Sequence, residues 1–172
     1  MKLETFRRRF RERRVRAGGQ SWRVIERKGR RGAPVLVMLP GTLGTAEIFW
    51  NQIAALGGKA RIVSVTYPAV GNILKLADGL AALYDKLGIE KASVIGSSLG
   101  GYLGQWFAAR HPERVETLYI GNSLTDPKTV NPARQPPSAQ STCRTADTLL
   151  IPRGAPGASR SACSCRRIWG SA

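Results

Sequence analysis

Apolar strands and amphipathic helices alternate along the middle of this chain, and this alternation constrains the fold more than any other feature of the sequence. The expected strands are 21–27, 35–39, 61–68, 91–96 and 115–122. The expected helices are 45–56, 72–87 and 99–111. Strands that are connected through helices form a parallel sheet with helices on both faces. We therefore predict an α/β fold with a mostly parallel, doubly wound sheet.

The segment after Asn72 has the clearest helical pattern. Its apolar residues recur at intervals of three and one, which places them on one face of a helix. These residues are Ile73, Leu76, Ala77, Leu80, Leu83, Tyr84 and Leu87. Asn72 can accept hydrogen bonds from the first turn of this helix, and Gly88 stands where the helix is expected to stop. In the same way, Thr45 is expected to cap the helix 45–56.

A Gly-x-Ser-x-Gly sequence lies at the junction between the expected strand 91–96 and the expected helix 99–111. It reads GSSLG at residues 96–100. The glycines at its two ends permit a sharp turn that lifts the Ser98 hydroxyl above the end of the strand. Free N–H groups at the helix N-terminus favour the development of negative charge beside it. The pattern predicts that Ser98 is a catalytic nucleophile.

A second glycine-rich loop follows the expected strand 35–39 and reads PGTLG at residues 40–44. Because the carboxyl ends of parallel strands meet at one edge of a sheet, this loop is expected beside Ser98. Backbone N–H groups in such a position stabilise the oxyanion that forms when a carbonyl is attacked. We predict that Thr42 and Leu99 provide these N–H groups. In the alternative interpretation, the glycines of both segments serve only tight turns and packing.

These segments resemble the α/β-hydrolase superfamily. Within it, the sequences LPGTLGTAEIFWNQI, GSSLGG and GNSLTD resemble the maspardin-like proteins. The similarity extends over about residues 21–129, roughly two-thirds of the chain. The resemblance implies the fold, the serine at the turn and the oxyanion loop. Most of the superfamily are esterases, lipases and related hydrolases, whereas maspardin-like proteins are regarded as non-catalytic binding or adaptor proteins.

The chain departs from the superfamily pattern on its C-terminal side. The superfamily order is nucleophile, acid and then a histidine after the last strand, but His111 is the only histidine of this chain. It follows Ser98 on the same expected helix at a distance of about 20 Å, so we assign it to the end of the helix and not to catalysis. Asp126 is the candidate acid of the triad, or alternatively it begins a turn.

Two functions follow from these observations. The first is a serine hydrolase of the esterase type that acts on a small-molecule ester. Its triad is incomplete in this chain, so the chain itself is expected to be inactive. The alternative is a non-catalytic, maspardin-like binding or adaptor protein with a protein partner. No cofactor is expected, and no metal, because the three cysteines lie in the last 41 residues without a nearby histidine.

The charge of the chain is unevenly distributed. Residues 1–32 carry 13 Lys and Arg residues and 3 acidic residues, whereas residues 33–131 carry 8 and 7. A basic end can bind nucleic acid, but no aromatic RNA-binding motif accompanies it, so we expect no nucleic-acid partner. The sequence has neither a signal peptide nor an apolar run long enough to span a membrane. We therefore expect a cytoplasmic protein.

We expect three parts along the chain. Residues 1–20 form a basic arm that is solvated, and residues 21–131 form a partial α/β-hydrolase domain that is truncated at its C-terminal side. Residues 132–172 are rich in Pro, Ala, Ser and Arg, so we expect a low-complexity tail that is disordered or translated out of frame. The strand 115–122 would then be an edge with unpaired backbone groups.

Overall fold

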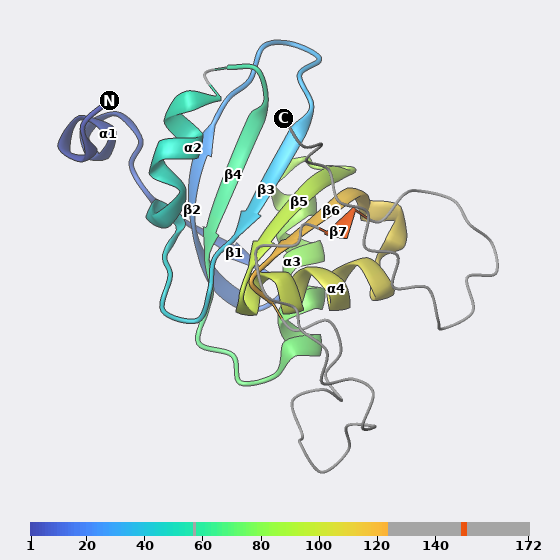
Figure 1. Cartoon of the computed structure of the whole chain (residues 1–172). Coiled ribbons are helices and arrows are strands. Elements are labelled where there is room, and N and C mark those ends of the chain that lie inside the picture. The colour runs from blue at the N-terminus through green and yellow to red at the C-terminus, as the bar shows by residue number, and fades with distance from the viewer. Residues whose placement is uncertain (57, 124–148, 151–172) are drawn as a thin grey trace, which may run out of the picture.

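A computed structural model describes residues 1–56, 58–123 and 149–150 of the chain. Within these residues the strands form one sheet in the order β1-β2-β4-β3-β5-β6-β7 (Figure 1). Strands β4, β3, β5 and β6 run parallel, whereas β1, β2 and β7 pair antiparallel with their neighbours. The strands are β1 (Arg13–Ala17), β2 (Gln20–Arg27), β3 (Val35–Leu39), β4 (Arg61–Thr66), β5 (Ala92–Ser97), β6 (Val115–Gly121) and β7 (Leu149–Leu150). The prediction of a mostly parallel α/β sheet is confirmed.

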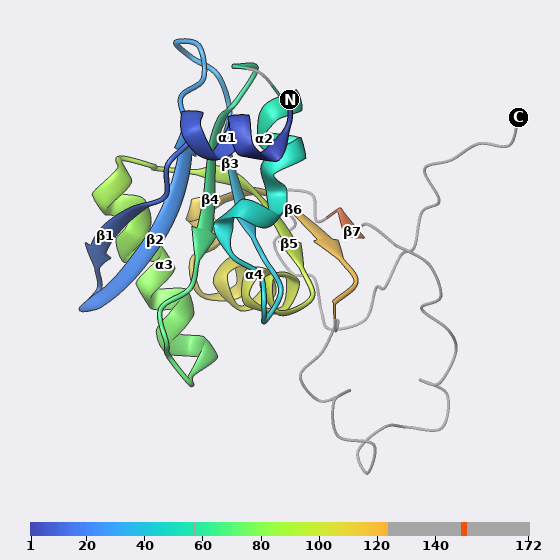
Figure 2. The ribbon, with the colours of Figure 1, turned by 90° about the vertical axis from the view of Figure 1, so that its left-hand side faces the viewer.

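Helices cover both faces of this sheet (Figure 2). They are α1 (Leu3–Arg9), the 3₁₀ turn η1 (Ala46–Phe49), α2 (Trp50–Ala55), α3 (Ile73–Leu87), α4 (Leu99–Arg110) and the 3₁₀ turn η2 (Pro112–Arg114). Helices α3 and α4 pack against each other on one face, and α1 and α2 lie on the other. The doubly wound arrangement therefore follows from the alternation of strands and helices in the sequence.

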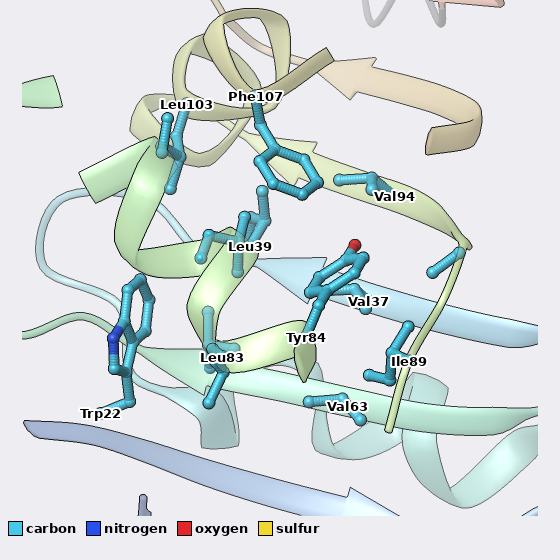
Figure 3. Close-up of a cluster of buried hydrophobic side chains, with 14 of the residues drawn as sticks. Trp22, Val37, Leu39, Val63, Leu83, Tyr84, Ile89, Val94, Leu103 and Phe107 are labelled. Carbon is cyan, nitrogen blue, oxygen red and sulfur yellow. The ribbon is translucent and has the colours of Figure 1, made fainter. Parts of the chain in front are cut away.

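The larger apolar core lies between the sheet and the pair of helices α3 and α4 (Figure 3). Tyr84 of α3 and Phe107 of α4 are both buried, and their ring centroids lie 5.1 Å apart. Leu83 and Leu103 fill the same core from the two helices. Each buried side chain of this size stabilises the fold by about 2 kcal/mol. This packing fixes α4 on the sheet and so places its N-terminus at the carboxyl end of β5.

Helix α3 begins and ends where the sequence predicts. The Asn72 side chain accepts hydrogen bonds from the N–H groups of Leu74 and Lys75, at 2.9 and 3.0 Å. Gly88 ends the helix with a φ of 61°, a left-handed conformation that favours glycine. The predicted cap and stop are confirmed.

The segment after β3 differs from the uniform helix that we expected over 45–56. Its first turn is the 3₁₀ turn η1, and the Thr45 side chain makes no capping hydrogen bond. The N–H of Ala46 donates instead to the Thr66 hydroxyl on β4, at 2.7 Å. Thr45 therefore occupies the cap position, as predicted, but its side chain does not cap the turn, because the Thr66 hydroxyl takes that role. Helix α2 follows within the expected range.

The N-terminal segment also differs from the solvated arm that we expected. Helix α1 lies on the domain, with the Phe6 side chain fully buried. The Phe6 ring contacts Phe10, at 5.1 Å between centroids, and Trp50 of α2, at 6.4 Å. The Arg7 guanidinium also donates to both carboxylate oxygens of Glu47, at 2.6 and 2.8 Å. The two phenylalanines therefore form a packed face, and the arginines beside them coat the surface.

A tight hairpin brings β1 into the sheet. Gly18 and Gly19 connect β1 to β2 and have φ values of 57° and 71°, the left-handed conformation that a two-residue hairpin turn of this type needs. Since β2 pairs in turn with β4, the turn extends the sheet by one strand. We expected β2 alone in this region.

Strand β6 has a further neighbour beyond β5. Strand β7 pairs antiparallel with it, and the backbone register pairs Tyr119 with Leu150 and Ile120 with Leu149. Our prediction that β6 has only unpaired backbone groups at this edge is therefore wrong at these two positions.

The three cysteines and Asp126 lie outside the described residues. None of the described helices has the length and apolar character needed to cross a bilayer.

Candidate active site

Ser98 lies at the turn between β5 and α4, with an exposed side chain. Its φ of 52° and ψ of −119° belong to a region that residues with a Cβ atom rarely adopt. A Cβ atom at Gly96 would lie 2.6 Å from the Gly101 Cα, and one at Gly100 would lie 2.7 Å from the Pro40 oxygen. Both glycines are therefore required, because β5, α4 and the end of β3 approach each other too closely for a side chain.

Hydrogen bonds from both sides of the turn hold Ser98 in this conformation. Its N–H donates to the Gly121 carbonyl at the end of β6, at 3.0 Å. Its carbonyl accepts from the N–H groups of Gly101 and Tyr102, at 3.0 and 3.1 Å, and from the Ser123 hydroxyl, at 2.7 Å. The strained backbone is thus supported by the first turn of α4 and by the end of β6.

The loop 40–44 lies against Ser98, as the sequence predicts. A Cβ atom at Gly41 would lie 3.3 Å from the Ser98 Cβ and 3.8 Å from the Ser98 Oγ. In the part of the chain that the structure describes, neither the Thr42 N–H nor the Leu99 N–H donates a hydrogen bond to another protein group. Both amides are therefore available to an oxygen bound beside Ser98. Leu43, at the tip of the loop, is 98% exposed.

Three hydroxyl groups at the end of β4 contact the two ends of this loop, and the sequence analysis missed them. The Tyr67 hydroxyl donates to the Pro40 carbonyl at 2.8 Å, and the Ser64 hydroxyl donates to the Ala46 carbonyl at 2.7 Å. Thr66 accepts from the Ala46 N–H, as described above. Burial raises the pKa of the Tyr67 hydroxyl, so it is a neutral donor at ordinary pH. The run SVTY was the available signal, because alternate positions of a strand place Ser64 and Thr66 on one face.

His111 lies at the opposite end of α4 from Ser98. The twelve residues of this helix extend about 18 Å. The His111 Nε2 lies 3.0 Å from a carboxylate oxygen of Asp78 on α3, and the Arg110 guanidinium donates to both oxygens of this carboxylate, at 2.9 Å. The hydrogen bond from Arg110 lowers the pKa of the Asp78 carboxyl, and the contact with His111 acts in the same direction. The structure therefore does not bring His111 and Ser98 together.

No group of three or more His, Cys, Asp or Glu side chains could hold a metal ion among the described residues. The candidate site consists of the Ser98 turn, the loop 40–44 and the hydroxyl groups of Ser64, Thr66 and Tyr67.

The sequence profile of the α/β hydrolase fold matches residues 34–164, more than half of the chain. This chain belongs to the α/β-hydrolase fold family. Maspardin from Homo sapiens is 38% identical over 99 residues, which are 56% of this chain and 32% of maspardin. Maspardin from Danio rerio has the same identity and coverage. The chain thus spans about a third of the length of these relatives. The match to the hydrolase profile extends beyond residue 131, into the segment 132–172 that we expected to be a tail.

The solved structures that are similar to this one include an esterase and an epoxide hydrolase. The naproxen esterase of Bacillus subtilis has a TM-score of 0.58 and is 28% identical, over 67% of this chain and 47% of the esterase. The epoxide hydrolase VrEH1 from Vigna radiata has a TM-score of 0.63 over 74% of this chain and 42% of that one. Because it is only 22% identical, its similarity supports the fold alone. The predicted resemblance to the α/β hydrolases, including maspardin, is confirmed.

Proposed function

We propose that this chain carries the nucleophile and the oxyanion-binding groups of a serine hydrolase that acts on small carboxylic esters. The observation that supports this most is the exposed Ser98 in its strained turn, with the loop 40–44 packed beside it. The similarity to the naproxen esterase supports the choice of an ester as substrate.

In the proposed reaction, the Ser98 Oγ attacks the carbonyl carbon of the ester. The bond between Oγ and the acyl group forms, the alcohol leaves with a proton, and water later releases the acid. The N–H groups of Thr42 and Leu99 stabilise the oxyanion, and the N-terminus of α4 favours the same charge. Asp126 remains the proposed acid of the triad.

Removal of the proton from the Ser98 hydroxyl limits the rate of this reaction. A base must lie within about 3 Å of the serine hydroxyl, but His111, the one histidine of the chain, lies at the far end of α4. Enzymes that lose a triad residue keep a rate about 10³ to 10⁴ times that of the reaction in water, through the oxyanion groups and binding. We expect this chain to react slowly and chiefly by a single acylation.

A fluorophosphonate probe tests this proposal. The bond between the Ser98 Oγ and phosphorus forms as fluoride leaves, and the mass of the protein increases by the phosphonyl group. We expect peptide mapping to place this label on Ser98, and Ser98→Ala to abolish it. The matched control is Ser97→Ala, which removes the neighbouring hydroxyl and should leave the labelling unchanged. Folded wild-type protein that remains unlabelled after long incubation would contradict the proposal.

A non-catalytic binding protein is the second candidate function, and the position of His111 favours it. The His111 imidazole contacts Asp78 and is therefore part of a surface cluster. A binding protein would leave the probe unreacted and would still bind a carboxylic ester or acid beside Ser98. Bound ester analogues that raise the melting temperature of Ser98→Ala and of the wild type equally, without labelling, would favour this function.

A further inference from the structure

We propose that Ser64, Thr66 and Tyr67 are positioning residues that hold the oxyanion loop 40–44 against Ser98. This inference deepens the proposed function and rests on it, because the loop carries the proposed Thr42 donor. It assigns a role to three hydroxyl groups that bind the backbone at the ends of the loop.

The three hydroxyl groups bind the backbone on both sides of the loop. Before the loop, the Pro40 carbonyl accepts from Tyr67 at 2.8 Å. After the loop, the Ala46 N–H donates to Thr66 and the Ala46 carbonyl accepts from Ser64, both at 2.7 Å. Ser64 is 0% exposed and Thr66 is 8% exposed, so water has little access to compete for these bonds.

The loop itself has little internal support. Between Pro40 and Ala46, one backbone hydrogen bond is formed within the loop, from the Gly44 N–H to the Gly41 carbonyl at 3.0 Å. The side chains of Thr42 and Leu43 are exposed and pack against no core. The bonds at its two ends therefore determine where the Thr42 N–H lies.

The orientation of the Thr66 hydroxyl is fixed by its two partners. The Thr66 hydroxyl donates to a Glu12 carboxylate oxygen at 2.5 Å, so its lone pairs remain for the Ala46 N–H. Glu12 is held by Arg23, at 3.3 Å. The segment before β1 is thereby connected to the candidate site through Thr66.

Tyr67 lies near β2, the end of β3 and the first turn of α4. Its ring packs edge-on against Trp22, with centroids 6.4 Å apart, which holds the hydroxyl toward Pro40. The Pro40 oxygen also lies close to Gly100 in the first turn of α4, where a Cβ atom would be 2.7 Å from it. A shift of this carbonyl would move Gly41, and with it the Thr42 N–H, relative to Ser98.

Tyr67→Phe tests the proposal, because it removes the hydroxyl and keeps the ring. We expect the Gly44 amide to exchange its hydrogen about fivefold faster, since a net hydrogen bond is lost at the end of the loop. We expect labelling of Ser98 by the fluorophosphonate probe to slow by a similar factor. The matched control is Tyr119→Phe, because the Tyr119 hydroxyl has no hydrogen-bond partner among the described residues. This control should change neither rate.

The other anchor gives an independent test should Tyr67→Phe not fold. Thr66→Val removes both hydrogen bonds of Thr66 at nearly constant size, and Thr66→Ser restores the hydroxyl. We expect faster exchange at Ala46 in the valine variant and recovery in the serine variant.

The outcomes separate this inference from the proposed function. Unchanged exchange at Gly44 and Ala46 in these variants overturns the inference. An increase in amide exchange that is as large in α3 and α4 as in the loop also overturns it. Ser64, Thr66 and Tyr67 would then stabilise the whole domain and would not position the loop in particular. Faster exchange confined to the loop, in a protein whose Ser98 never labels, supports the positioning role and refutes the proposed hydrolase.

Discussion

Replacing Ser98 by glycine is expected to stabilise the protein, because Ser98 holds a backbone conformation that residues with a Cβ rarely adopt. Its φ is 52° and its ψ is −119°. Ser98→Ala is the matched control, since it removes the same hydroxyl and keeps the Cβ atom. The two variants therefore differ only in the steric cost of the backbone and in the freedom of the unfolded chain.

The magnitude follows from two opposing contributions. A non-glycine residue in a strained region of this kind costs about 1–3 kcal/mol, which glycine relieves. Glycine also gives the unfolded chain more freedom, which costs about 0.4–1 kcal/mol. The Ser98 side chain makes no capping hydrogen bond, so little is lost with the hydroxyl. We expect Ser98→Gly to have a free energy of unfolding about 1 kcal/mol higher than Ser98→Ala.

Urea unfolding followed by circular dichroism measures this difference. If the slopes with denaturant are equal, the shift in midpoint reports stability alone. A difference of about 1 kcal/mol corresponds to roughly 3 °C in melting temperature for a domain of this size. Equal stabilities, or an alanine variant that is more stable, would refute the view that the turn is strained. Neither variant should react with the fluorophosphonate probe, so stability and reactivity are expected to change independently.

Three further perturbations test the fold, each by urea unfolding. Asn72→Ala removes two capping hydrogen bonds and should lower the free energy of unfolding by about 1 kcal/mol, whereas Asn72→Asp should lower it less. Phe6→Ala should lower the free energy of unfolding by about 3 kcal/mol, because the ring is fully buried. An unchanged stability would instead support the solvated arm that we expected from the sequence. Burial acts to raise the pKa of Glu26, but hydrogen bonds from Arg13 and Arg61 outweigh it, and the net pKa is lowered. The stability from Glu26 is therefore present above its unfolded pKa, near 4.5, and is lost as the pH falls through the lower folded value; Glu26→Gln should show less of this loss.

The sequence predicts best where one local pattern decides the structure. The helix after Asn72 combines a cap, a regular apolar face and a glycine stop, and all three are present in the structure. The turn at Ser98 is indicated by Gly96 and Gly100, because the neighbouring backbone leaves no room for a Cβ atom at either position. In both cases the pattern that predicts the element lies within a short stretch of sequence, although the turn at Ser98 is also held by distant partners, the Gly121 carbonyl and the Ser123 hydroxyl.

Contacts between distant segments account for the features that the sequence analysis missed. The Arg-rich run 13–17 has few apolar residues, and it becomes a strand because Gly18 and Gly19 turn it back onto β2. The residues Gly-Gly between two strand-like runs were a signal for this hairpin. Thr66 is joined to Ala46, 20 positions away, and to Glu12, 54 positions away, and no periodicity predicts such pairs.

The candidate site is assembled from the ends of four neighbouring strands, and their contacts hold the strained turn at Ser98 in place. The end of β3 supplies the loop beside Ser98, and the end of β4 supplies the hydroxyl groups that hold this loop. Strand β5 leads into the turn, and the end of β6 accepts the Ser98 N–H. None of these contacts involves His111. The backbone geometry that we propose for oxyanion binding is thus a product of the sheet, whereas proton transfer in the proposed reaction needs a separate group. The two can be tested separately, because loop variants act on the first and labelling of Ser98 reports on the second.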